Sequence, residues 1–238
     1  MAAARPLHAQ MPGWQDRAYI NVNLGWRPSS SPFVETSAPV IYDEHAALST
    51  THTVASGLVP VDLAGGVRLV GHLGVGAAYT LFNNTEMATV SALVPHPLRF
   101  NQPRAASAVA PFAYSESALH FQAVWLLPVT DRLDIAVTGG PSLVTISQDL
   151  VSGIMIEENS PTFATVGIAK VVLASQTATA LAFNVGADVT YFLTPMIGVG
   201  VTVRHAGGSV ELSQTGGGTV TLDPSGFRFG FGARIRIR

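Results

Sequence analysis

The residues of this sequence whose types and spacing could do chemistry include a histidine with a carboxylate close by. His120 follows Glu116 by four positions and precedes Gln122 by two. Residues at even spacing share one face of a β-strand, so these three side chains would point the same way. A histidine beside a carboxylate could act as a general acid or base. Because no recognised motif places a nucleophile beside the pair, the competing interpretation is an interior histidine held by hydrogen bonds.

A larger set of charged residues occupies the polar positions of segments in which every second residue is apolar. Buried charges must be paired and hydrogen-bonded, and arginine offers a planar fork that can bind a carboxylate through two bonds. We therefore expect salt bridges that plug a narrow barrel, and if solutes pass at all, the excess of arginine favours anions. The residues of this lumen charge network are Asp62, Arg68, Glu116, His120, Arg132, Asp134, Asp188, Arg204, Arg228, Arg234 and Arg236.

The sequence does not indicate a metal, cofactor or nucleic-acid site. It contains no cysteine, and its histidines lack the HExxH spacing of zinc enzymes. The glycine runs "LGVGA" and "IGVGV" lie inside strand patterns with no helix after them, so they are not expected to bind a nucleotide. The net charge of −2 offers no basic field for nucleic acid. We expect no cofactor, no metal and no catalytic residues.

The elements that position these side chains are predicted to be strands, because the apolar residues recur with period two throughout the chain. The final stretch "GFRFGFGARIRIR" shows the pattern most clearly, with apolar residues alternating with arginine or glycine. Most of the segments have about the length that a tilted strand needs to cross a bilayer. The eight predicted strands span residues 17–26, 58–70, 73–81, 116–127, 132–146, 180–192, 197–204 and 226–238.

The connections between these strands alternate between short and long, as in bacterial outer-membrane barrels. Short turns are predicted around 71–72, 128–131 and 194–195, and long loops over 27–57, 83–115, 148–177 and 205–225. Ten strands would result if "EMATVSALVP" or "TFATVGIAKVVLA" crossed the membrane instead of extending a hairpin. The long loops contain more acids than bases, which predicts an acidic outer rim; the acids are Glu35, Asp43, Glu44, Glu86, Asp149, Glu157, Glu158, Glu211 and Asp223.

The apolar face of the strands is predicted to point outward. The interior of an eight-stranded barrel is only just filled by side chains, and the apolar face is too bulky to fit inside. Only 12% of the residues are charged while 47% are hydrophobic, which suits a belt solvated by lipid. Outward aromatic residues are expected to form two girdles at the membrane surfaces; they are Trp26, Tyr79, Trp125, Tyr191 and Phe227.

At this level of pattern the chain resembles the OmpA-like small outer-membrane β-barrel proteins. The resemblance covers residues 17–238 and rests on "AYINVNLGW", "VRLVGHLGVGAAYT" and "FRFGFGARIRIR". It implies an all-β, antiparallel up-and-down transmembrane barrel with short periplasmic turns and long extracellular loops, located in the bacterial outer membrane. It also implies contact with outer-membrane lipids and lipopolysaccharide, and insertion by the barrel-assembly machinery. That machinery recognises a final strand ending in an aromatic residue, whereas this chain ends on Arg238.

Residues 17–238 are expected to form one barrel domain, preceded by a trimmed leader or a flexible tail over residues 1–16. The expected function is a non-enzymatic one: envelope structure, surface interaction or restricted passage of small solutes. The first alternative is a barrel hydrolase or acyltransferase that modifies lipid A through His120. The second alternative is a soluble lipocalin-type barrel that binds a ligand inside.

Overall fold

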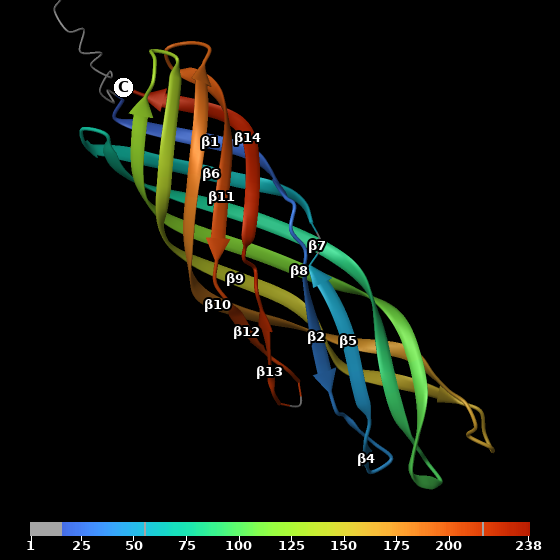
Figure 1. Cartoon of the computed structure of the whole chain (residues 1–238). Coiled ribbons are helices and arrows are strands. Elements are labelled where there is room, and N and C mark those ends of the chain that lie inside the picture. The colour runs from blue at the N-terminus through green and yellow to red at the C-terminus, as the bar shows by residue number, and fades with distance from the viewer. Residues whose placement is uncertain (1–15, 55, 216) are drawn as a thin grey trace, which may run out of the picture.

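In the computed structural model, which describes residues 16–54, 56–215 and 217–238, the chain is built of antiparallel β-strands (Figure 1). The expected leader or tail therefore lies outside the described residues, apart from residue 16. In these described ranges there is no helix that is long and apolar enough to cross a membrane. The strands are β1 (Ala18–Arg27), β2 (Ser31–Ser37), β3 (Val40–Ile41), β4 (Glu44–His45), β5 (Ala47–Val54), β6 (Gly57–Val70), β7 (Leu73–His96), β8 (Arg99–Pro128), β9 (Leu133–Glu158), β10 (Val166–Phe192), β11 (Ile197–Gly207), β12 (Val210–Ser213), β13 (Thr219–Leu222) and β14 (Gly226–Ile237).

Eight of these strands close into a ring in the order β7, β6, β1, β14, β11, β10, β9, β8 and back to β7. The first and last strands of the ring pair in register from Ala18 opposite Ile237 to Trp26 opposite Phe229. The prediction of an eight-stranded antiparallel barrel is therefore confirmed. Closure leaves no strand edge of the ring exposed, which is a requirement for any sheet that lies in lipid.

Short turns join ring strands at one end of the barrel, where the C-terminus also lies (Figure 1). They connect β6 to β7, β8 to β9 and β10 to β11, at the three places that the sequence predicted. Gly71 adopts a φ of 55° in the first turn, a left-handed conformation that glycine reaches without steric cost. The positions of these turns fix which end of each strand faces which side of the membrane.

All four predicted loops contain strands: β2 to β5 lie in residues 27–57, and β12 and β13 lie in residues 205–225. Residues 83–115 and 148–177 largely continue the ring strands as two long hairpins, with β7 paired to β8 as far as His96 opposite Arg99. The segments "EMATVSALVP" and "TFATVGIAKVVLA" lie in these hairpins and add no strand to the ring. Because β8 has 30 residues, it is about 100 Å long. It therefore reaches far beyond a belt that is about 25 Å tall.

The part of the molecule beyond the ring is named here the extension. Its sheet contains the outer halves of β7, β8, β9 and β10, with β5 paired to β7 and β2 paired to β5. The hairpin of β12 and β13 lies against β10 and β2. The extension therefore forms a second, curled layer around its own interior, coaxial with the ring (Figure 1).

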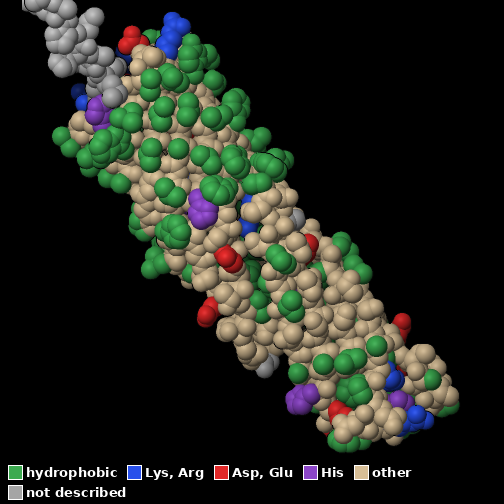
Figure 2. All heavy atoms as spheres, in the orientation of Figure 1, with side chains coloured by type: hydrophobic (Ala, Val, Ile, Leu, Met, Phe, Trp, Pro, Cys, Tyr) green, Lys and Arg blue, Asp and Glu red, His purple; other side chains and the backbone are tan. Residues whose placement is uncertain are grey.

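The two parts of each long strand bury opposite kinds of side chain. In β7 the outward residues of the ring are apolar, from Leu73 to Leu81, whereas the interior residues there are small or polar. Beyond Leu81 the even-numbered residues still point inward, but they are now apolar, and the buried ones include Phe82, Val90 and Val94. Figure 2 shows the result: hydrophobic side chains crowd the surface over the ring, and the surface of the extension near it is mostly free of them. We call the apolar surface of the ring the belt.

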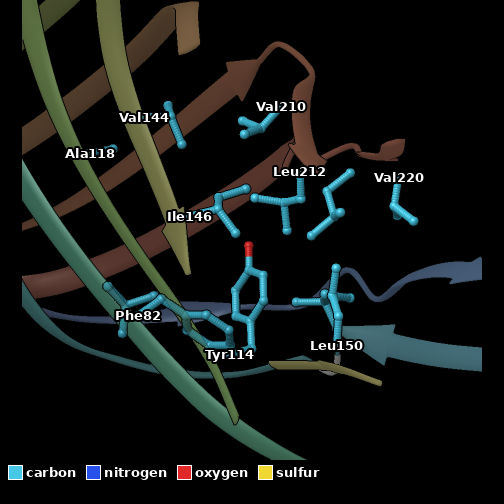
Figure 3. Packing of buried hydrophobic residues seen from close by; sticks show 12 residues of the cluster. Phe82, Tyr114, Ala118, Val144, Ile146, Leu150, Val210, Leu212 and Val220 are labelled. Atoms are coloured by element: carbon cyan, nitrogen blue, oxygen red, sulfur yellow. The ribbon is translucent and has the colours of Figure 1, made fainter. Parts of the chain in front are cut away.

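The interior of the extension is a hydrophobic core in two parts. The part nearer the ring is built from five strands and the β12–β13 hairpin, and Figure 3 shows Phe82, Tyr114, Ile146 and Leu212 pointing toward one another. The outer part is built around Val90 and Phe112, both fully buried. Burying such side chains is the main force that holds the extension together.

Candidate functional site

The lumen of the ring contains a network of buried ion pairs, beginning near the short turns. Arg236 on β14 lies between two acids: its Nη2 donates to Asp134 Oδ2 at 2.9 Å, and its Nε lies 3.2 Å from Asp16 Oδ2. Its guanidinium also stacks over the ring of Phe192 at 3.3 Å from the centroid. These contacts come from four segments, so one arginine joins the wall of the barrel across its interior.

The next group of the network is centred on Arg234. Its Nε and Nη2 donate to the two carboxylate oxygens of Asp188 at 3.2 and 2.6 Å, which is the bidentate geometry that arginine favours. Its Nη1 donates to Asn23 Oδ1 at 2.5 Å. A Cβ at Gly200 would lie 2.7 Å from Arg234 Nε, so a glycine in the facing strand provides the space for this side chain. In the same region Arg204 donates to Asp62 at 3.3 Å.

The last group lies where the ring meets the extension and is centred on Glu116. Arg27 donates to its Oε2 at 3.0 Å, Arg228 pairs with its Oε1, and the Tyr114 hydroxyl donates to Oε2 at 2.8 Å. Arg27 also lies over the Phe82 ring at 5.5 Å. The acid is thus held by two cations and a hydroxyl at the boundary between the lumen and the hydrophobic core of the extension.

His120 lies in the lumen beside a serine. Its Nδ1 is 2.7 Å from Ser142 Oγ, and its Nε2 is 3.4 Å from Thr80 Oγ1. Asn184 donates to the same serine oxygen at 2.9 Å and accepts from Gln122 at 2.9 Å. His120 and Ser142 are both 0% exposed. The geometry is that of a hydrogen-bonded interior network in which both side chains are fully buried.

Nine of the eleven residues predicted for the lumen charge network are buried inside the barrel. The prediction was wrong for Arg68 and Arg132, which are exposed near the short turns: Arg68 lies near the end of β6, and Arg132 precedes the first residue of β9. Arg27, Asp16 and Ser142 also belong to the buried polar groups of the lumen but were not predicted. Arg27 could have been found by continuing the alternation of β1 one step beyond Trp26.

The charges of the buried network balance. Five arginines and five acids take part, so the excess of arginine on which the anion preference rested is absent from the pairs in the described residues; the participants are Arg27, Arg204, Arg228, Arg234, Arg236, Asp16, Asp62, Glu116, Asp134 and Asp188. A cavity of about 40 Å³ remains between the groups of Arg234 and Arg236, which is enough space for a water molecule. No group of three or more metal-ligating side chains that could hold an ion is found within the described ranges.

The aromatic residues predicted for the girdles point away from the lumen. Each is between 40% and 53% exposed, and they are Trp26, Tyr79, Trp125, Tyr191 and Phe227. They share this outward face with the aliphatic residues of the belt. The belt surrounds a lumen that contains ion pairs, and this arrangement is stable only if the surrounding medium is lipid.

A second buried polar cluster lies in the extension and was not predicted. His52 on β5 is 0% exposed, with Nε2 at 2.9 Å from Glu35 on β2 and Nδ1 at 2.9 Å from Glu86 on β7. Phe33 stacks on the imidazole and Phe112 meets it edge-on, both with centroids at 4.6 Å. Each ring nitrogen lies within hydrogen-bond distance of a different carboxylate. The cluster therefore fastens edge strand β2 to the sheet, and we name it the histidine clamp.

The clamp and the far end of the extension account for several acids that the sequence analysis assigned to an acidic rim. At the far end, Arg104 pairs with Glu158 and donates to the carbonyls of Pro95 and Phe163 at 2.7 and 2.9 Å. The Tyr42 hydroxyl donates to Glu158 at 2.6 Å. This hydrogen bond raises the pKa of Tyr42. Partial burial acts to raise the pKa of Glu158, but the bonds from Tyr42 and Arg104 outweigh it and hold the value below the ordinary one.

These features define a class of protein: a closed eight-stranded transmembrane β-barrel with a plugged lumen and a long extracellular extension. The fold is shared with solved outer-membrane proteins. The chain matches the outer membrane protein OprG from Pseudomonas aeruginosa with a TM-score of 0.54 and 8% identity, over 95% of this chain and 98% of that one. It also resembles Neisserial surface protein A (TM-score 0.44, 13% identity, 92% and 97% covered) and the outer membrane protease OmpT from Escherichia coli (0.48, 10%, 96% and 99%). No family model and no curated protein matches the sequence.

Proposed function

We propose that the protein is an integral protein of the bacterial outer membrane with a non-enzymatic role, in which a closed barrel anchors a rigid extension at the cell surface. One observation carries the proposal: the interior changes from ion pairs to a hydrophobic core where the outer surface changes from apolar to polar. A strand with this inversion is matched to lipid over one part and to water over the other. In a soluble ligand-binding barrel the belt would be exposed to water, which is unfavourable for an apolar surface of this size.

Insertion tests the first part of this proposal. The purified chain should fold in detergent or phosphatidylcholine vesicles, migrate faster in gels before heating than after it, and resist extraction by carbonate. Release of folded protein into a buffer without detergent would instead support the lipocalin-type alternative.

The packing of the lumen supports a structural role over solute passage. Ion pairs occupy the lumen of the ring, and two hydrophobic clusters occupy the interior of the extension that continues from it. We therefore expect planar bilayers that contain the protein to show no stable conductance steps. Stable conductance steps would instead support the restricted passage of small solutes through the lumen. The ion selectivity of these steps would then show whether anions are preferred.

The enzymatic alternative, lipid A modification through His120, now has a serine within reach of the histidine. Burial of both residues, and Thr80 rather than a carboxylate at the second ring nitrogen, support the non-enzymatic role. The proposal predicts that wild type and Ser142→Ala leave the acyl chains of lipid A equally intact. Deacylation or acyl transfer by the wild type that Ser142→Ala abolishes would contradict it.

The proposed role includes three partners: outer-membrane lipids, lipopolysaccharide, and the machinery that assembles barrels. The belt supports contact with lipid, and the alternating final strand β14 supports assembly by that machinery. Membership of the OmpA-like group is part of the proposal and rests on the sequence pattern.

A further inference from the structure

The outward surface of β7, β8, β9 and β10 changes abruptly where the belt ends. Hydrogen-bonded partners on the four strands form rows, and the last apolar row is Tyr79, Leu119, Leu143 and Leu181. The next two rows are Leu81, Ser117, Thr145 and Thr179, then Asn83, Ser115, Ser147 and Thr177. We name the polar residues of these two rows, together with two neighbours on the same surface, the hydroxyl face. It consists of Ser117, Thr145, Thr179, Asn83, Ser115, Ser147, Thr177, Thr85 and Ser175.

Five hydroxyls of this face, all on β9 and β10, are hydrogen-bonded to one another. Thr145 and Thr179 lie 2.8 Å apart, Thr177 donates to Ser147 at 3.0 Å, and Ser147 and Ser175 lie 3.2 Å apart, all between oxygens of β9 and β10. Each hydroxyl has one proton and two lone pairs, so a single mutual bond leaves capacity to bind a ligand. Their spacing is fixed by the sheet, about 4.8 Å across strands and about 6.7 Å between alternate residues along a strand.

The hydroxyl face is hollowed. A depression of about 480 Å³ lies over β7, β8, β9 and β10, and its lining includes Asn83, Thr85, Ser115, Ser147 and Ser175, with Ala113 between them. No charged residue lines it within the described part of the chain. The nearby carboxylate of Asp149 is engaged by the backbone N–H of Ala113 at 3.1 Å. The surface therefore offers hydroxyl and amide groups without a counter-charge for phosphate or ammonium groups.

We propose that the hydroxyl face docks neutral sugar units of the glycolipid that surrounds the barrel in the outer leaflet. The inference rests on the proposed membrane location and names the partner of this surface. Its occupant follows from continuity with the belt: a lipid whose acyl chains lie against Leu119, Leu143 and Leu181 must carry its head group over the rows that follow. A phosphate head group would be held by arginine or lysine, whereas uncharged hydroxyls and amides match the hydroxyls of a sugar.

The test compares vesicles that differ only in the saccharide. Wild type and Ser115→Val/Ser147→Val are folded into phosphatidylcholine vesicles that contain either a glycolipid with neutral core sugars or its sugar-free lipid portion. The wild type should unfold about 2 to 4 °C higher with the sugars than without them, and the double variant should lose this shift. The matched control is Ser107→Val, which removes an exposed serine of β8 outside the hollow and should keep the full shift.

Several outcomes would overturn the proposal. An equal midpoint in the two vesicles, or an equal shift in wild type and the double variant, removes the sugar contact. A shift of the same size from the free saccharide added to phosphatidylcholine vesicles assigns the surface to soluble glycans instead. If the double variant does not fold, Asn83→Leu on β7 provides a second test. Insertion into phosphatidylcholine is measured in the same samples, so failure of the sugar effect is distinguishable from failure of the proposed function.

Discussion

At the scale of single residues, the molecule depends on buried charges that have well-defined partners. The lumen pairs and the histidine clamp are both desolvated, and they lie in separate parts of the chain. Removing one member of such a group leaves its partner charged and buried, which costs about 3 to 5 kcal/mol. Replacing a whole group with apolar residues costs much less, so paired substitutions can separate the two effects.

The lumen network can be tested at Glu116. Glu116→Leu leaves the guanidinium groups of Arg27 and Arg228 without their shared carboxylate, and we expect a loss of about 3 to 5 kcal/mol in the free energy of unfolding. Urea unfolding in detergent micelles measures it. Arg132→Gln, at an exposed turn position, should change stability by no more than about 0.5 kcal/mol. Equal effects of the two substitutions would refute a stabilising network.

The histidine clamp makes a prediction confined to the extension. His52→Phe preserves a flat ring between Phe33 and Phe112 but removes the imidazole from Glu35 and Glu86. Each carboxylate then keeps only a backbone donor, the N–H of Val151 for Glu35 and that of Thr53 for Glu86. We expect proteases to cleave the extension faster while the barrel still migrates as a folded species before heating. Adding Glu35→Leu and Glu86→Leu should restore part of the resistance. No change in cleavage for His52→Phe would show that the clamp does not hold β2.

At the scale of elements, the two long hairpins are joined by the pairing of β8 with β9 as far as Tyr114 opposite Gln148, continue without this pairing beyond it, and are fastened to one another again at their far ends. Tyr42 comes from the β3–β4 connection, Arg104 from β8 and Glu158 from β9. Three segments that are distant in sequence thus meet at one carboxylate. Such a contact restricts the fraying that is common at the tips of exposed hairpins.

This contact should weaken in acid. The pKa of Glu158 in the folded protein is below its ordinary value near 4.5, so the ionised form stabilises the fold. That contribution is complete above the ordinary pKa and is lost as the pH falls through the lower value in the folded protein. Hydrogen exchange at the hairpin tips should therefore accelerate, relative to the ring, when the pH falls below about 4.5. Glu158→Gln should exchange quickly at both pH values, and the same acid response in that variant would exclude Glu158 as its source.

At the scale of the whole molecule, one continuous sheet serves two solvents. The ring exposes apolar groups and buries ion pairs, whereas the extension is built around two hydrophobic clusters, without any break in β7, β8, β9 or β10. The cost of a charge on the outer surface should therefore depend on its position along a strand.

Two substitutions on β8 test this dependence. Phe121→Arg puts a charge in the middle of the belt residues of β8 and should cost about 2 to 4 kcal/mol in a bilayer. Ser107→Arg puts the same charge on the same strand in the extension and should cost no more than about 0.5 kcal/mol. Chemical denaturation in phosphatidylcholine vesicles compares the two variants. A similar cost at both positions would contradict the position of the belt.

The sequence predicted the ring because its strands follow one rule from end to end, as the pairing of β1 with β14 shows. It did not predict the extension, because the apolar residues of β7 change from odd positions, such as Tyr79 and Leu81, to even ones, such as Phe82 and Val90. A search for one continuous apolar face ends at that change and leaves the rest as a loop. The partners of Glu35 and Glu86 could not be predicted either, since His52 reaches them through sheet pairing and not through spacing in the sequence.

The row of Tyr79, Leu119, Leu143 and Leu181 sets the depth at which the barrel lies in the bilayer. A strand rises about 3.3 Å per residue and is tilted by about 40°. Moving the last apolar outward row by two residues would therefore shift the membrane–water boundary along the barrel by about 5 Å. A lineage could thus raise or lower the extension above the bilayer by exchanging single outward residues, without altering strand number, turns or the plugged lumen. The height at which the surface meets its surroundings is then a property that can change independently of the fold.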